Sequence, residues 1–146
     1  ILMLTQNYAN HRQFVPMFHY VLLGILALTL IGSVVNLYLS WGDHTRLYSA
    51  SLIFVLALCT PMVAFFARIF SLKAQDRAIR AEENLRAFAM TGKLLDPRLT
   101  IRQIVGLRFA SDGEFAALAA RAAKEGLSSD DIKKAVKDWR ADMYRV

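Results

Sequence analysis

The sequence predicts an all-α protein: a transmembrane helical hairpin, then a helical stalk and a small three-helix cytoplasmic tail. Two long uncharged apolar stretches, 55% hydrophobic residues in a chain of 146, and strong helix formers after the second stretch predict this fold. So high an apolar content is unusual for a soluble domain of this length. The expected parts are a cytoplasmic N-terminal segment (1–15), a membrane hairpin (16–72), a stalk (73–92) and a tail (93–146).

The two apolar stretches, residues 21–39 and 50–67, are each long enough to cross a bilayer. The first would rise about 28 Å as an α-helix, close to the thickness of the hydrocarbon layer. Pro16 suits the first turn of this helix, where no backbone N–H is needed. The short link 42–48 forces the two helices into an antiparallel hairpin with both chain ends on one side.

Basic residues near the ends of the spans set the expected orientation. The link carries Arg46, and the segment after the second span carries Arg68, Lys73, Arg77, Arg80 and Arg86. Because basic segments stay on the cytoplasmic side, both termini are expected to be cytoplasmic. The protein is then integral to the inner (cytoplasmic) membrane and in contact with its lipids.

Each predicted membrane helix has a stripe of small and polar residues, the composition that lets membrane helices pack closely. The candidate helix-packing residues are Thr29, Gly32, Ser33 and Asn36 in the first helix and Ala57, Thr60 and Ala64 in the second. Because an amide is costly in lipid, Asn36 is expected to contact either Thr60 or another subunit. The remaining faces are bulky and apolar, so they are expected to contact lipid or other integral membrane subunits.

His19 lies two residues before the uncharged core of the first span, at the depth of the lipid headgroups. A histidine between aromatic residues at this depth is typical of an interfacial anchor whose polar end stays wet. The open alternatives are ligation of haem or of the magnesium of chlorophyll, and proton transfer. Because His44 lies at the opposite end of the hairpin, a two-histidine haem site within one chain is disfavoured. No intrinsic cofactor is expected, and chlorophyll or haem at a subunit interface is the alternative.

Residues 63–90 contain neither Gly nor Pro, so the second span is expected to continue as a helical stalk. Glu82 and Arg86 have the i,i+4 spacing of a surface ion pair. Gly92 is the expected C-terminal stop.

Three helix-start signatures follow in the tail: Thr100 with Gln103, Ser111 with Glu114, and Ser128 with Asp131. Apolar residues at helical spacing give the expected tail core: Phe115, Leu118, Ile132, Val136 and Trp139. The third helix is expected to continue to Met143. So small a core gives marginal stability, so the tail is expected to dock on the stalk, a partner or the membrane surface.

The sequence lacks a phosphate-binding glycine loop, a haem-attachment cysteine pair and a clustered set of metal ligands. Its one cysteine, Cys59, lies in an apolar stretch. Helix capping explains the acidic residues around Asp112 and Asp130. Basic residues of the last helix, such as Lys133 and Lys137, alternate with acidic ones, which disfavours nucleic acid as a partner. No catalytic or metal-binding residue is assigned, and the protein is not expected to be an enzyme.

The strings LRFASD (107–112) and WRADMYRV (139–146), with the leader QNYANHRQFVP, carry a family resemblance. The chain resembles small two-span bacterial membrane proteins of an uncharacterised family. The resemblance covers nearly the whole chain, and it implies a hairpin with a cytoplasmic helical tail and no active site.

The leading hypothesis is a non-catalytic accessory or scaffold subunit of a larger membrane protein complex. It depends on the apolar outer faces, the undersized tail core and the lack of catalytic motifs. The alternative is a pigment- or haem-contacting subunit of a photosynthetic or respiratory complex that uses His19. A third hypothesis, in which the tail acts on a soluble ligand or nucleic acid, has no motif in its favour.

Overall fold

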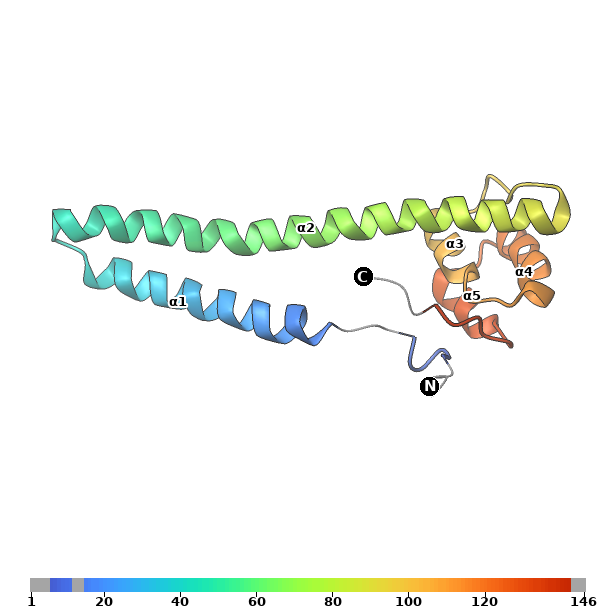
Figure 1. Cartoon of the computed structure of the whole chain (residues 1–146), viewed down its shortest axis with the longest axis horizontal. Helices are drawn as coiled ribbons and strands as arrows, with labels where there is room; N and C mark the ends of the chain where they lie inside the picture. Colours follow the sequence, from blue (N-terminus) through green and yellow to red (C-terminus); the bar gives the residue numbers. More distant parts are fainter. Residues whose placement is uncertain (1–5, 12–14, 143–146) are drawn as a thin grey trace. The chain divides into compact units, whose positions relative to one another are not determined.

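A computed structural model describes residues 6–11 and 15–142, and over these residues the chain is all-helical, as predicted (Figure 1). A π-helical turn (Met17–Leu22) is followed by α1 (Leu23–Leu39), α2 (His44–Thr91), α3 (Ile101–Leu107), α4 (Asp112–Glu125) and α5 (Ser129–Ala135). The chain divides into two compact units. The hairpin unit is Phe14–Ser71, and the tail unit combines Ile1–Gln13 with Leu72–Val146.

In the hairpin unit, α1 runs back alongside the first part of α2 (Figure 1). The segments Met17–Leu39 and His44–Thr91 are both long and apolar enough to cross a membrane. The first begins as predicted after Pro16, which occupies the N-cap position. Its opening turn is π-helical instead of α-helical, which the sequence did not indicate.

The connection between the two helices is shorter than predicted. Helix α1 is capped by Ser40, and Gly42 adopts a left-handed conformation with φ of 96°. The Asp43 carboxylate then accepts hydrogen bonds from the backbone N–H groups of Thr45 and Arg46 at 3.1 and 3.3 Å. These are the bonds of a helix N-cap, so α2 begins at His44, inside the segment predicted to be the link.

Helix α2 continues without interruption from the predicted second span into the predicted stalk. It contains Pro61, which cannot donate a backbone hydrogen bond to the carbonyl of Ala57. The Thr60 hydroxyl lies 3.4 Å from that carbonyl and donates to the Leu56 carbonyl at 2.8 Å, so a side chain partly replaces the lost donor. The helix ends at Gly92, whose φ is 71°.

The three predicted helix-start residues of the tail are the N-caps of α3, α4 and α5. Thr100 and Gln103 form a complete capping box, and the Ser128 hydroxyl accepts the N–H of Asp131 at 3.1 Å. Ser111 opens α4 without a side-chain cap bond. Gly126 ends that helix with φ of 65°.

The core of the tail unit contains the predicted residues Phe115, Leu118, Ile132 and Val136, with Trp139 half-buried at its edge. It also includes Ile79 and Ala87 of α2. The tail helices therefore dock on the stalk, one of the three supports that the sequence left open. This contact enlarges a core that three short helices could not build alone.

The predicted continuation of the third helix to Met143 is wrong within the described residues. Helix α5 ends at Ala135, and Trp139 instead pairs with Ala110 in an isolated antiparallel bridge. The Glu114 carboxylate accepts the backbone N–H groups of Lys137 and Asp138 at 3.1 to 3.2 Å. Since these N–H groups would otherwise donate along the helix, this acceptor favours the extended path. Met143 itself lies outside the described residues.

Candidate functional site

The two helices of the hairpin unit meet along a narrow seam. Apart from the half-buried Ser51 and Ile69, its less exposed positions are Leu26, Leu30, Ser33 and Leu37 on α1, the C-cap Ser40, and Leu47, Ala50, Phe54, Ala57, Pro61, Ala64 and Arg68 on α2. On both helices the positions alternate in steps of three and four, which is the spacing of a left-handed helix pair. The fully buried members are all small: Ser33, Ser40, Ala50 and Ala57.

Only part of the predicted helix-packing set lies in this seam. Ser33 and Ala57 are buried and Ala64 is half-buried, whereas Thr29, Gly32, Asn36 and Thr60 are exposed within the unit. The prediction grouped residues by small and polar character. The seam follows a seven-residue spacing that also includes three leucines of α1. It therefore occupies a different arc of the helix surface from most of the predicted stripe.

Asn36 is the most polar exposed side chain within the predicted first span. Among the described residues its side-chain amide makes no hydrogen bond, although its backbone carbonyl accepts the N–H and hydroxyl of Ser40 at 3.0 and 2.8 Å. Thr29 differs, because its hydroxyl donates to the Ile25 carbonyl at 2.8 Å. Of the two contacts expected for Asn36, the one with Thr60 is therefore not formed.

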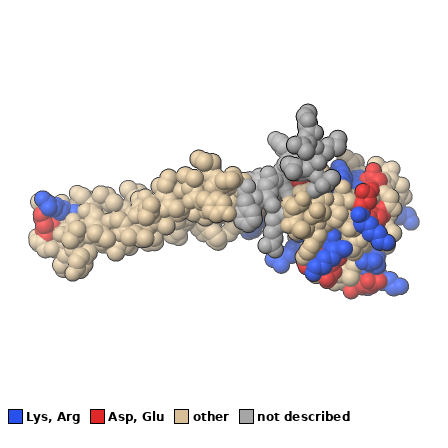
Figure 2. All heavy atoms as spheres, turned by 90° about the horizontal axis from the view of Figure 1, so that it is seen from below, with Lys and Arg blue, Asp and Glu red and all other residues tan. Residues whose placement is uncertain are grey.

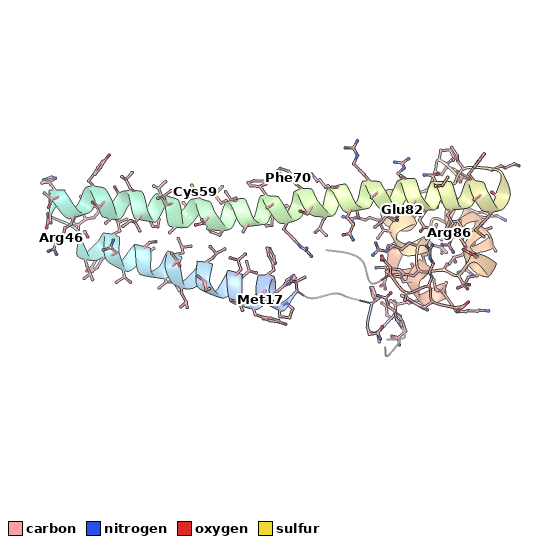
Figure 3. All side chains as sticks on the ribbon, viewed as in Figure 1. Met17, Arg46, Cys59, Phe70, Glu82 and Arg86 are labelled. Atoms are coloured by element: carbon pink, nitrogen blue, oxygen red, sulfur yellow. The ribbon has the colours of Figure 1, made fainter. Side chains whose placement is uncertain are left out.

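The outer surface of the hairpin unit is apolar over nearly its whole length. On the face that Figure 2 shows, the visible part of the rod is free of Lys, Arg, Asp and Glu except near its tip. Asp43 and Arg46, in the link and at the start of α2, form an ion pair at 3.4 Å. Large apolar side chains are exposed on this surface, such as Leu28 (71%) and Phe70 (62%), and Figure 3 shows Phe70 pointing outward. In water such a surface would aggregate, so it requires lipid or protein around it.

His19 lies in the π-helical turn and is half-buried. Its Nδ1 is 3.0 Å from the Val15 carbonyl oxygen and 3.2 Å from the Val15 nitrogen. The edge of its ring packs on Phe18, with centroids 5.2 Å apart. The guanidinium carbon of Arg68 in turn lies 5.6 Å from the centroid of the Phe18 ring. The imidazole is thus held in place by the backbone and an aromatic neighbour.

In the tail unit, the N-terminal segment Gln6–His11 packs on the end of the tail. The Tyr8 hydroxyl donates to Asp130 Oδ1 at 2.7 Å, and the Gln6 side chain accepts the N–H of Asp142 at 2.8 Å. The His11 ring is buried, 5.9 Å from the rings of both Phe109 and Trp139. No spacing rule joins residues so distant in sequence, and sequence reasoning missed this contact.

Asp130 is the centre of charge in this contact. Hydrogen bonds from Lys134 and Tyr8 hold the pKa of the Asp130 carboxyl below its ordinary value. The same carboxylate raises the pKa of the Tyr8 hydroxyl and that of the Lys134 ammonium group. All three shifts favour the charged carboxylate as the acceptor for the N-terminal segment.

An ion-pair network, buried at Arg86 and Glu83 and exposed at Asp112, joins the stalk to the tail. The Arg86 guanidinium donates to Glu83 at 3.0 Å, to Asp112 at 2.6 Å and to the Ala110 carbonyl at 2.8 Å, and it stacks on Phe115 at 4.3 Å. The predicted surface pair with Glu82 is therefore replaced by these contacts. With Arg140, the network lines a shallow hollow of about 340 Å³. Each of the three guanidinium nitrogens of Arg86 has an acceptor. We therefore interpret the network as a structural link between the stalk and the tail and not as an anion-binding site.

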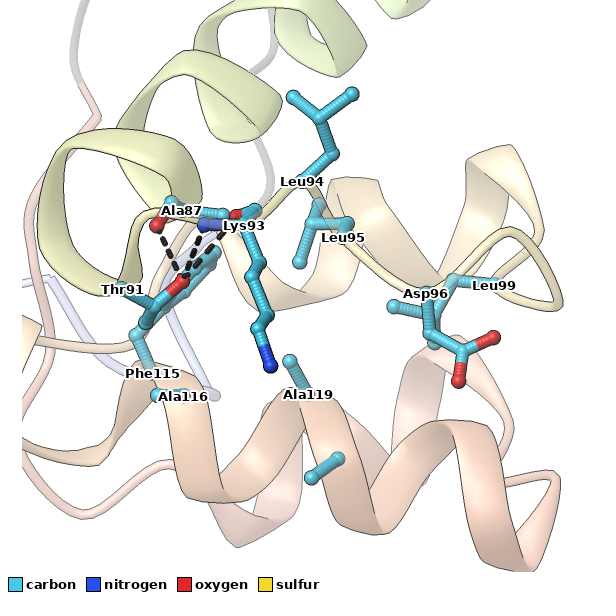
Figure 4. Close-up of a pocket in the computed structure, with 11 residues that line it drawn as sticks. Ala87, Thr91, Lys93, Leu94, Leu95, Asp96, Leu99, Phe115, Ala116 and Ala119 are labelled. Atoms are coloured by element: carbon cyan, nitrogen blue, oxygen red, sulfur yellow. Dashed lines mark hydrogen bonds between the residues drawn. The ribbon is translucent and has the colours of Figure 1, made fainter.

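A second hollow, of about 190 Å³, lies between the end of α2, the segment 93–99 and α4 (Figure 4). Its walls are mostly alanine and leucine. The Thr91 hydroxyl, which bonds the Ala87 carbonyl at 2.8 Å, is oriented by its own helix end. The lining has few polar groups; one of them is Asp96, whose pKa the Arg98 guanidinium lowers to about 2 through its hydrogen bonds. It has no constellation for catalysis.

The sequence matches the model of a protein family over residues 3–146. That family is described as a family of unknown function, DUF6526. The chain belongs to this family. The expected resemblance to an uncharacterised family is thereby confirmed at the level of the family. No curated protein and no solved structure matches the chain.

The described residues of this DUF6526 member include extensive exposed surfaces, above all the apolar face of the hairpin. Across residues 6–11 and 15–142, no group of three or more His, Cys, Asp or Glu side chains could hold a metal ion. The exposed face of the hairpin, which includes Asn36, and the tail unit are the features on which a functional proposal can be based.

Proposed function

We propose that the chain is a non-catalytic accessory or scaffold subunit of a larger membrane protein complex. The hairpin would anchor it in the inner membrane, and the tail unit would face the cytoplasm. The supporting observation is the exposed Asn36 amide, which has no hydrogen-bond partner among the described residues and lies in an apolar helix. In lipid such a group is costly, and a neighbouring membrane helix is the usual partner.

The position of Asn36 beside Gly32 and Thr29 favours a helix as the occupant of this face. All three are exposed, and a small residue one turn from a polar one lets another backbone approach closely. The α1–α2 seam leaves this stripe unused. A transmembrane helix of another subunit would give the amide a carbonyl or hydroxyl and would bury the adjoining valines.

The placement of the N-terminal segment and the tail on one side of the membrane has support beyond the distribution of charge. Tyr8 and His11 pack on residues 109–139 within one unit, so the N-terminal segment and the tail must lie on the same side of any membrane. Only an even number of spans between them permits this. Arg68, Lys73 and Arg77 after the second span favour the cytoplasmic side.

Native gel analysis after mild detergent extraction tests the proposal. We expect the wild-type chain to migrate with other membrane subunits, and Asn36→Leu to release it by removing the interhelical hydrogen bond. Ser71→Ala is the control, because the Ser71 hydroxyl donates to the Ala67 carbonyl of its own helix, α2, and is not part of the Asn36 stripe. Migration of the wild-type chain solely as a free monomer would overturn the proposal.

A second candidate is contact with haem or chlorophyll through His19. One observation favours it: Nδ1 is held at 3.0 Å from the Val15 carbonyl, and such an orienting bond is common in histidines that ligate through Nε2. An unchanged pigment content and spectrum in the purified complex of His19→Ala would eliminate this candidate.

A further inference from the structure

One face of the stalk in the tail unit carries an apolar stripe that nothing in the unit covers. The stalk stripe consists of Ala74, Ala78, Ala81, Leu85 and Phe88, and all five are exposed. Leu85 is 69% and Phe88 54% exposed, which is high for large apolar side chains outside a membrane. From the arrangement of this stripe we propose that the stalks of two copies of the chain pair in parallel along it.

The spacing of the stripe is that of a two-stranded coiled coil. Its members alternate in steps of four and three, so at about 100° per residue they fall within about 80° of arc. The stripe lies opposite the side of α2 that packs on the tail, where Ile79, Glu83 and Ala87 are buried. A second helix can therefore approach without displacing any tail contact.

Charges beside the stripe select a second copy in parallel as its occupant. Arg77 precedes the core position 78, and Glu82 follows the core position 81. In a parallel pair these are the flanking positions that face each other across the interface, five residues apart, so Arg77 of each copy meets Glu82 of the other. Both side chains are exposed, and among the described residues neither makes an ion pair.

The side chains of the stripe also suit close pairing. The three alanines let the helix backbones approach, while Leu85 and Phe88 supply the larger knobs toward the end of the stalk. Parallel alignment follows from the membrane anchoring argued under the proposed function, since copies inserted in one orientation present their stalks in the same direction. Confinement to one membrane also raises the effective concentration of the second copy, which favours pairing through a short stripe.

Charge reversal in the full-length protein tests the geometry. Self-association would be measured by energy transfer between donor- and acceptor-labelled copies in lipid vesicles. Arg77→Glu alone and Glu82→Arg alone should each weaken pairing by about fivefold, because like charges then face each other twice per dimer. The double variant Arg77→Glu/Glu82→Arg should restore it. Failure of the double variant to recover would overturn the parallel register.

Apolar substitution tests the stripe itself. Leu85→Glu should abolish energy transfer by placing a charge at the centre of the pair. Leu94→Glu is the matched control, because Leu94 is 67% exposed in the tail unit but lies outside the stripe. Equal loss in both variants, or no loss in either, would contradict the proposal. Circular dichroism of each variant shows whether its helices are intact.

Disulfide trapping gives a third, independent readout in native membranes. In a Cys59→Ser background, Ala81→Cys should cross-link to a second copy on mild oxidation, since paired core positions bring Cα atoms within reach of a disulfide. Arg80→Cys, one residue away on another face, should not. Cross-linking at both positions or at neither would overturn the pairing. Loss of the larger complex with Asn36→Leu, while cross-linking at position 81 persists, would separate this inference from the proposed function.

Discussion

The tail unit and the hairpin unit differ in how they bury their apolar side chains. In the tail unit, short helices bury Phe109, Phe115 and Ile132 to 1% exposure or less, and the stalk covers what they leave open. In the hairpin unit, the fully buried positions are four small residues, and large side chains such as Leu28 and Tyr38 remain more than two-thirds exposed. The tail unit is stabilised by its own contacts, whereas the hairpin depends on its surroundings.

The sharpest test of this contrast compares two phenylalanines. Phe115 is 1% exposed in the tail core, and Phe70 is 62% exposed on the hairpin. Phe115→Ala should lower the free energy of unfolding of the tail unit by about 3–5 kcal/mol, because it leaves a cavity in the core. Phe70→Ala should leave it unchanged. Trp139 fluorescence during urea unfolding, in a Trp41→Phe background, measures both, and similar losses would contradict the contrast.

Removing the stalk-to-tail ion pair should have the next largest effect. Arg86→Met leaves the Glu83 carboxylate, 6% exposed, with only the more distant Arg140 guanidinium at 3.7 Å, and breaking a buried ion pair costs about 3 kcal/mol. Arg80→Met on the exposed part of the same helix should change unfolding by less than about 0.5 kcal/mol. The same fluorescence assay decides. Should both variants unfold alike, the stalk does not support the tail through this network.

A smaller loss is expected at the start of α3. Gln103 completes the capping box with Thr100 and donates to the Leu127 carbonyl at 2.8 Å. Gln103→Ala should cost about 1–2 kcal/mol, because it removes the side-chain acceptor of the Thr100 backbone N–H and leaves the part-buried Leu127 carbonyl without its side-chain donor. Arg102→Ala, exposed on the same turn, is the control. Equal stability of the two variants would show that the cap is not needed.

The smallest effect concerns the N-terminal segment and pH. Because its hydrogen bonds with Lys134 and Tyr8 lower the pKa of the Asp130 carboxyl, the stabilisation they give is complete above the ordinary carboxyl pKa. It is lost as the pH falls through the lowered value. The protection factors of the amides at residues 7–11, which are corrected for the intrinsic slowing of exchange in acid, should therefore fall on acidification. Asp130→Asn should bring the lower protection to neutral pH, whereas Asp138→Asn should not, and identical behaviour of the two variants would exclude this role.

Much of the fold could be predicted because local signals agree with it. These local signals are the two charge-free stretches, the uninterrupted stalk and the three N-cap residues Thr100, Ser111 and Ser128. Each of them lies within one helix or at its start. The end of α5 could not be predicted, since the Glu114 carboxylate that draws Lys137 and Asp138 out of the helix lies on a different element. Local periodicity contains no information about such an acceptor.

The sequence predicted which kinds of residue pack between the hairpin helices, but not which arc of each helix faces its neighbour. Composition indicated which residues suit close packing, yet the seam contains Ser33 and excludes Asn36, three residues further on. Which arc of a membrane helix faces its neighbour depends on the summed fit of all side chains, leucines included. The cluster of Tyr8 and His11 with Trp139 could not be predicted from the sequence for another reason: it joins segments that no motif connects.

The bond between Tyr8 and Asp130 spans 122 positions of the chain, and that between Gln6 and Asp142 spans 136. Translation delivers the first member of each pair before the two hairpin helices and the second member after them. Both hairpin helices are therefore synthesised before the tail unit is able to close. Contacts between such distant positions form slowly, so closure of the tail unit would follow synthesis of the hairpin, and a nascent chain truncated before Asp130 would leave the segment Gln6–His11 undocked.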